Sequence, residues 1–124
     1  MLSDLLQNGA AVDSPDNQGW TPLMSASEYG HLDIVQLLLQ NGAAVDSPDN
    51  QGWTPLMSAS GSGHLEVMQL LLQNGAAVNF TSNEGWTPLM SAFQNGDLEG
   101  VQLLLQNGAA VDSPLRWARP LRSK

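Results

Sequence analysis

The sequence predicts an all-α protein, built as a solenoid of stacked helix-turn-helix units with projecting turns. The main observation is the phrase NQGWTPLMSAS, which occupies residues 17–27 and recurs without change at residues 50–60. A third copy, NEGWTPLMSA, starts at residue 83, so the copies begin 33 residues apart, at 17, 50 and 83. Self-similarity at a fixed period of this size is typical of stacked arrays, in which each unit contacts only its neighbours.

The period divides the chain into an array and a tail. We expect one array domain at 1–115, made of a partial unit at 1–16 and full units at 17–49, 50–82 and 83–115. Residues 116–124 are either a basic tail or an interrupted fourth unit, because Trp117 to Leu121 resembles the repeated WTPL with one extra residue. A chain that starts and stops within units also fits a fragment of a longer array, and that alternative stays open.

Each unit carries the signals of a short first helix. Threonine stands at the expected N-cap, and proline follows it at the first helical position, where no amide donor is needed. These pairs are Thr21-Pro22, Thr54-Pro55 and Thr87-Pro88. Glycine then ends the helix, since it accepts the left-handed conformation; the three glycines are Gly30, Gly63 and Gly96.

A second helix is predicted from Leu32 to Gln40, with apolar residues at helical spacing. Asn41-Gly42 ends it, and the following AAVDSPDNQG has the Pro, Asp, Asn and Gly of a tight turn. Helices this short are marginal alone because nucleation is costly. Stacking of neighbouring units therefore has to supply the buried surface.

The units resemble ankyrin repeats. The resemblance rests on the G-x-TPL run from Gly19 to Leu23, the GH pair at Gly30-His31 and the NGA-x-V run from Asn41 to Val45. It implies an ankyrin-type solenoid, a curved stack of L-shaped helix-turn-helix units with projecting β-hairpin loops. It also implies a non-catalytic role in protein–protein recognition, through the hairpin tips and a concave row of first helices. The family usually has histidine after TPL. This chain has methionine instead, so a soft thioether takes that space: Met24, Met57 and Met90.

Three tryptophans recur at the period, beside the expected hairpins, and we weigh two roles for them. Aromatic anchors dominate interface energy, which favours a recognition stripe; alternatively, each indole packs on the next hairpin. The stripe consists of Trp20, Trp53 and Trp86. The first-helix ends differ most between copies, and in the resembled family they are common contact sites: Glu28, Tyr29, Gly61, Ser62, Gln94 and Asn95. A polar rim completes the candidate partner-binding set: Asn17, Gln18, Asn50, Gln51, Asn83 and Glu84.

Charge is distributed unevenly along the chain. All 12 Asp and Glu lie within residues 1–115, which contain no Lys or Arg, whereas all four basic residues lie in the last nine positions. Such a body repels phosphates, so neither nucleic acid nor an anionic membrane is an expected partner. A basic protein partner and simple solubility both explain the acidity. With no signal peptide and no apolar run of about 18 residues, we expect a monomer in the cytoplasm or nucleus.

The rival class is a small hydrolase. His31, His64 and Asp97 occupy one position in successive units, and serine is abundant. A metal site would need its ligands about 2 Å from one ion, whereas stacked helices lie about 8–10 Å apart. No phosphate-binding loop or nucleophile motif is present. We therefore expect no metal, no cofactor and no catalytic residue.

Two departures of the third unit change the size of an apolar or small side chain. Gly100 replaces Ile34 and Val67, and Phe93 replaces a serine. The two positions should be close across the turn between the helices. One hypothesis is a size exchange, in which the Phe93 ring fills the volume that Gly100 vacates; the other is simple decay of the unit.

Overall fold

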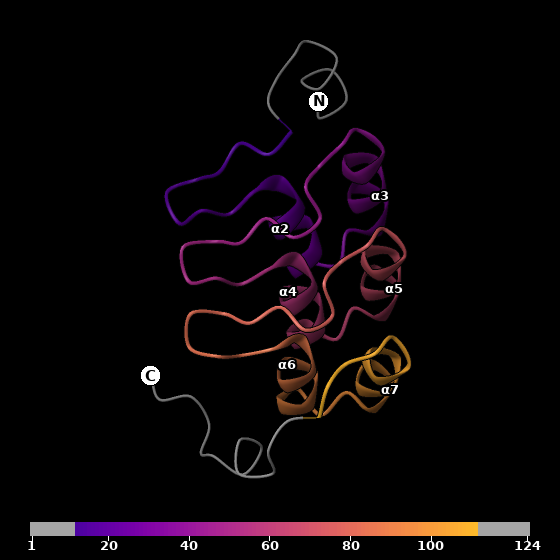
Figure 1. Cartoon of the computed structure of the whole chain (residues 1–124). Coiled ribbons are helices and arrows are strands. Elements are labelled where there is room, and N and C mark those ends of the chain that lie inside the picture. Colours follow the sequence, from indigo (N-terminus) through magenta and orange to yellow (C-terminus); the bar gives the residue numbers. More distant parts are fainter. Residues whose placement is uncertain (1–11, 112–124) are drawn as a thin grey trace.

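The computed structural model describes residues 12–111, which form six α-helices in three consecutive pairs and contain no strand. The first helices of the pairs pack side by side in one row, and the second helices pack in a parallel row (Figure 1). The first-helix row is α2 (Pro22–Glu28), α4 (Pro55–Ser62) and α6 (Pro88–Gln94). The second-helix row is α3 (Leu32–Gln40), α5 (Leu65–Gln73) and α7 (Leu98–Gln106). The all-α solenoid prediction is confirmed, whereas the unit boundaries remain a prediction.

The first helices begin at the predicted caps. Thr54 has an extended backbone, and its hydroxyl oxygen accepts a hydrogen bond from the Met57 amide at 3.3 Å, with Pro55 in the first turn. Thr21 and Thr87 cap α2 and α6 in the same way. Gly63 ends α4 at φ 74°, a left-handed conformation that glycine adopts without steric cost. The cap and stop signals of the sequence therefore locate these helices correctly.

The second helices end at asparagine. The Asn41 side-chain amide donates to the Leu37 carbonyl at 2.8 Å, and Asn74 and Asn107 make the same bond in α5 and α7. This carbonyl of the last turn also accepts from the backbone amide of the same asparagine, so the asparagine closes the helix end with two donors. The amphipathic helices then bury one face between the two rows. The core residues include Leu23, Val35, Leu38, Leu56, Val67, Met68, Leu71 and Leu104.

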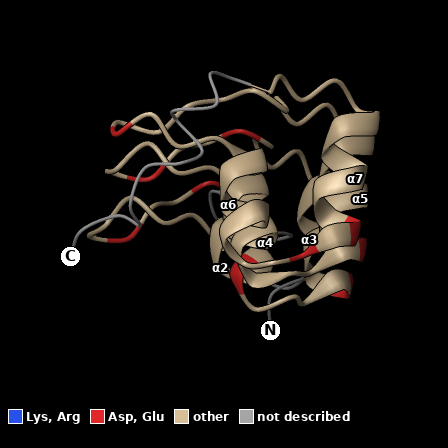
Figure 2. Ribbon diagram, turned by 90° about the horizontal axis from the view of Figure 1, so that it is seen from below, with Lys and Arg blue, Asp and Glu red and all other residues tan. Residues whose placement is uncertain are grey.

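Hairpin-shaped loops project beyond the first-helix row (Figures 1 and 2). In the second loop the Asp49 amide donates to the Trp53 carbonyl at 2.8 Å, and the Asn50 amide donates to Gln18 of the preceding loop at 3.0 Å. The third loop repeats the link, from the Asn83 amide to Gln51 at 2.9 Å. The side-chain amides of Asn50 and Asn83 add one further bond each, to the carbonyls of Asn17 and Asn50, both at 3.1 Å. Because neighbouring loops share only one backbone–backbone bond and no ladder, the described loops form no β-strand. These bonds nevertheless join the loop tips into one continuous edge.

A second series of bonds joins the units beside the second-helix row. The Asp13 carboxylate accepts from the Ala44 amide at 3.0 and 3.2 Å, and the Asp46 carboxylate accepts from the Ala77 amide at 3.1 Å through both oxygens. At the third step Asn79 replaces the aspartate. Its oxygen accepts from Ala110 at 2.9 Å, and its amide donates to the Gly108 carbonyl at 3.2 Å. Each unit is thus held to the next at both ends of its loop.

Candidate functional site

The tryptophans are positioned by the turns that precede them. One Asp16 carboxylate oxygen accepts from the amides of Gln18 and Trp20, both at 2.8 Å, and Asp49 does the same for Gln51 and Trp53. In the third loop the Ser82 hydroxyl replaces the carboxylate, accepting from the Trp86 amide at 3.1 Å. The three indoles are therefore presented by similar turns, between the loops and the first-helix row.

The three indoles nevertheless have different surroundings. Trp53 stacks on Trp86, with ring centroids 6.3 Å apart and an angle of 26° between the planes, and Trp86 is only 8% exposed. Trp20 is half-buried and makes no such ring pair with Trp53. The three indoles therefore differ in packing: Trp53 and Trp86 form a pair, and an open interval separates Trp20 from Trp53. Their role as a recognition stripe stays a prediction.

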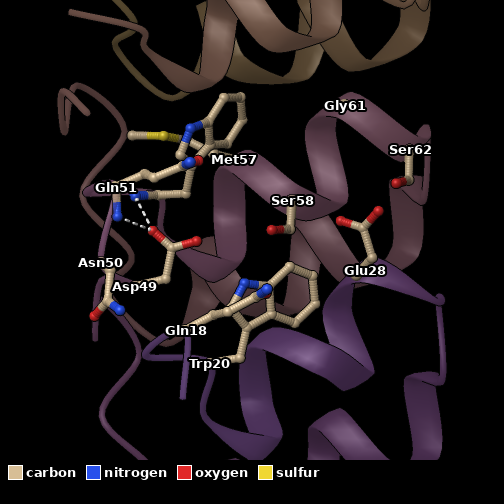
Figure 3. A pocket seen from close by; sticks show the side chains of 11 residues that line it. Gln18, Trp20, Glu28, Asp49, Asn50, Gln51, Met57, Ser58, Gly61 and Ser62 are labelled. Carbon is tan, nitrogen blue, oxygen red and sulfur yellow. Dashed lines mark hydrogen bonds between the residues drawn. The ribbon is translucent and has the colours of Figure 1, made fainter. Parts of the chain in front are cut away.

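A cavity of about 600 Å³ occupies that interval, and we call it the first hollow (Figure 3). Two loops and two first helices line it. Trp20 lies on one side of it, and Glu28 points from the end of α2 toward Ser58 and Ser62 of α4 (Figure 3). The full lining is Gln18, Trp20, Glu28, Asp49, Asn50, Gln51, Trp53, Met57, Ser58, Gly61 and Ser62.

A smaller cavity of about 350 Å³, the second hollow, lies at the corresponding place one unit further along. Its position matches the first hollow, but no carboxylate lines it, because Gly61 takes the place of Glu28 and Ser82 takes the place of Asp49 in the repeat. The lining residues are Trp53, Gly61, Trp86, Ser91, Gln94 and Asn95.

Most of the sequence-predicted site residues line one of the two hollows. The first hollow brings together Gln18, Trp20, Glu28, Asn50, Gln51, Trp53, Gly61 and Ser62, and the second adds Trp86, Gln94 and Asn95. Four predicted residues line neither hollow: Asn17, Asn83, Glu84 and Tyr29, of which Tyr29 is 66% exposed. Sequence reasoning missed Asp49, Met57, Ser58 and Ser91. Asp49 was detectable, because aspartate also precedes the first tryptophan by four residues, at Asp16.

The His/Asp row does not gather around one point. The His64 Nε2 atom lies 3.1 Å from the Glu28 backbone carbonyl and bridges two successive units, whereas the exposed His31 ring tilts against Tyr29 at 6.2 Å. Within residues 12–111 no group of three or more His, Asp and Glu side chains is placed to hold a metal ion. His64 therefore has a structural contact that accounts for its place in the repeat.

Comparison with known proteins agrees with this architecture. A family described as ankyrin repeats (3 copies) matches residues 43–114, more than half of the chain, and one described as ankyrin repeats (many copies) matches residues 5–56. The chain belongs to the ankyrin repeat family. Ankyrin repeats generally mediate protein–protein interactions and are typically non-catalytic. A relative in Rickettsia bellii, itself named as an ankyrin repeat protein, is 53% identical over 34 residues, which are 27% of this chain and 10% of that protein.

This ankyrin repeat chain replaces the usual histidine after TPL by methionine, and the structure shows what the thioether does. Met24 is fully buried, and its sulfur accepts a hydrogen bond from the Ser58 hydroxyl of the next unit at 2.9 Å. The sulfur thus fills the space and also makes a weak polar link between units. As for membrane contact, none of the helices within residues 12–111 has the length and apolarity needed to cross a bilayer.

The size exchange predicted between Phe93 and Gly100 is wrong. Phe93 is 57% exposed, and the space beside Gly100 belongs to other side chains. A Cβ built on Gly100 would lie 2.9 Å from the Asp97 Cγ and 3.4 Å from the Met68 methyl carbon. The carboxylate of Asp97 therefore occupies the vacated volume, with its Oδ2 buried and without a hydrogen-bond partner. The Phe93 ring instead helps to line an apolar depression with Leu89, Val101, Leu105 and Val111.

The basic tail expected at residues 116–124, and residues 1–11 of the partial unit expected at 1–16, lie outside the described residues.

Proposed function

We propose that the chain binds a protein partner through its loop–helix face, which consists of the loop tips and the residues that line the two hollows. The observation that carries this proposal is the first hollow. There, side chains from two loops and two helices surround an open space. Repeated apolar residues such as Leu56 and Leu71 are instead buried in the core. Cavities of this kind, with aromatic walls and a few polar groups, are where binding sites usually lie.

The partner we propose has a basic surface. Residues 12–111 carry carboxylates on the loops and on the second-helix row, and no Lys or Arg (Figure 2). Charge complementarity of this kind raises association rates and disfavours acidic competitors. Binding should therefore weaken as salt is added, because screening acts on exposed charges over about 8–10 Å. We further propose that the protein acts without catalysis, as a monomer, in the cytoplasm or nucleus.

The face is tested by site-specific photo-crosslinking in cells that express the protein. A benzoylphenylalanine residue at Gln51, an exposed loop position lining the first hollow, should crosslink to a partner protein. The same residue at Gln69, exposed on α5 in the second-helix row, is the matched control and should crosslink little. Crosslinks from position 69 with none from position 51 would place binding on the other side of the stack.

The partner captured in this way then serves for a mutational test. Trp20→Ala should reduce its affinity by about tenfold or more, because truncation of aromatic anchors commonly costs at least 1–2 kcal/mol. Trp20 is half-buried and outside the Trp53–Trp86 pair, so the helices should survive the change. Circular dichroism checks their content. Unchanged affinity in a folded variant would remove Trp20 from the interface.

A further inference from the structure

The first hollow is lined by two carboxylates, whereas the second is lined by none. The wall of the first hollow contains the Glu28 carboxylate, whereas the equivalent position at the second hollow is Gly61, and in the third unit it is Gln94. Asp49 also borders the first hollow, but one of its oxygens already accepts from two backbone amides of its own turn. Glu28 is therefore the carboxylate of this hollow that has neither oxygen engaged within residues 12–111.

The Glu28 side chain has unused hydrogen-bonding capacity. Its backbone carbonyl meets His64, but its carboxylate makes no hydrogen bond or ion pair with any residue of 12–111. The Glu28 side chain as a whole is half-buried and is directed from α2 toward α4 (Figure 3). A carboxylate with no cation nearby attracts a positive group, and this attraction grows where less water surrounds the two charges.

Trp20 supplies the second half of a cation site. The indole ring and the Glu28 carboxylate line the same hollow, together with the small polar side chains of Ser58 and Ser62. An indole face attracts cations through its quadrupole, and a carboxylate accepts charge-assisted hydrogen bonds. A planar guanidinium meets both requirements, because it stacks on a ring while donating in its own plane.

We propose that the first hollow receives an arginine side chain of the partner, with the guanidinium placed between Trp20 and Glu28. This inference rests on the proposed protein-binding function and names the chemistry of one contact within it. Charge supports the assignment, since residues 1–115 contain no cation that could compete from within the array. Lysine fits less well, because its ammonium is a compact, strongly hydrated charge without a flat face.

The test uses the full chain and three heptapeptides, acetyl-GSGXGSG-amide, in which X is arginine, lysine or citrulline. Citrulline has nearly the shape of arginine but no charge. Titration is followed by NMR through the indole N–H signals. The arginine peptide should shift the Trp20 signal in a saturable way, the lysine peptide should bind at least about threefold more weakly, and the citrulline peptide should not bind.

Matched charge variants separate a specific contact from the general acidity. Glu28→Gln should weaken arginine binding by about tenfold, the effect of losing a hydrogen bond to a charged group. Glu66→Gln removes the same charge from an exposed position on α5 and should change binding by less than about twofold. Equal effects of the two variants, or equal binding of the arginine and lysine peptides, would overturn the proposal.

Two further outcomes keep the inference and the proposed function apart. Peptide binding that appears only after Arg116, Arg119 and Arg122 are replaced by glutamine would assign the hollow to the chain's own arginines and overturn the partner assignment. Crosslinking at Gln51 without selective arginine binding would overturn this inference alone. Arginine binding without crosslinks at Gln51 would support the arginine site but overturn the proposed protein-binding face.

Discussion

At the scale of single residues, Asp97 and Gly100 show how one substitution makes room for another. Asp97 stands where His31 and His64 stand in the other units, and its carboxylate lies against Gly100, which has no Cβ to exclude it. One carboxylate oxygen is buried without a hydrogen-bond partner, which is energetically unfavourable. The Asp97 and Gly100 substitutions of the third unit are thus in direct spatial contact.

This contact is testable by a double-mutant cycle. In an Asp97→Ala background, Gly100→Ala should raise the free energy of unfolding by up to about 1 kcal/mol, the difference in helix propensity between the two residues. In the wild-type background the new Cβ meets the Asp97 carboxylate, so the gain should vanish or change sign. Urea denaturation followed by circular dichroism measures the free energy of unfolding of the wild type, the two single variants and the double variant. Additive effects would show that the carboxylate and the glycine do not interact.

At the scale of elements, short helices persist because bonds and burial tie each pair to the next. Helix α5 has nine residues, too few for stability alone. It is supported by the buried side chains of Val67, Met68 and Leu71. It is also supported just beyond its end, where the Ala77 amide donates to the Asp46 carboxylate. The loop aspartates therefore act as inter-unit clamps, one unit apart in the sequence.

The clamp at Asp46 gives a graded prediction. Asp46→Ala should lower the free energy of unfolding by about 1.5 kcal/mol, because the Ala77 amide loses a charged acceptor in a partly buried place. Asp46→Asn should lose less than half of that, since Asn79 already makes the equivalent bond to Ala110 at 2.9 Å. Urea denaturation midpoints with unchanged m-values report the difference. Equal losses in the two variants would mean that charge, and not the hydrogen bond, carries the contact.

At the scale of the whole molecule, the stack carries like charge without internal compensation. Residues 1–115 contain 12 carboxylates and no Lys or Arg, so the folded array repels itself at neutral pH. This repulsion opposes folding. The same negative charge attracts a cationic partner to the loop–helix face. Stability and binding are thereby linked to ionic strength in opposite directions.

Salt should therefore stabilise the protein while it weakens the proposed complex. Raising NaCl from 0.02 to 0.2 M (concentrations chosen around the physiological Debye length of about 8 Å) should raise the unfolding temperature by roughly 4 °C, equivalent to about 1 kcal/mol. The effect should level off above about 0.3 M, where screening is nearly complete. Glu66→Lys, on the exposed side of α5, should reduce the salt response. A rise that continues linearly to high salt would point instead to general solvent exclusion.

Local signals were enough to locate the helices. Thr54 and Pro55 predicted the start of α4, Gly63 its end, and Asn41-Gly42 the end of α3, because caps and turns depend on residues within a few positions. The candidate site was predicted in part. Glu28 and Gly61 were selected because the copies differ there, and both line the first hollow. Tyr29, selected for the same reason, points away toward His31.

The sequence by itself determined the repeat, the helix ends, the need for stacking and the acidic character, since each follows from spacing, local chemistry or composition. Only the tertiary structure decided which side chains meet across unit boundaries. It paired Trp53 with Trp86, left Trp20 beside an open hollow, set His64 against Glu28 of the preceding unit, and put Asp97 where Phe93 was expected. The reason is physical: identical phrases occupy equivalent places along the stack, but each side chain packs against neighbours from other units, and those neighbours are not identical.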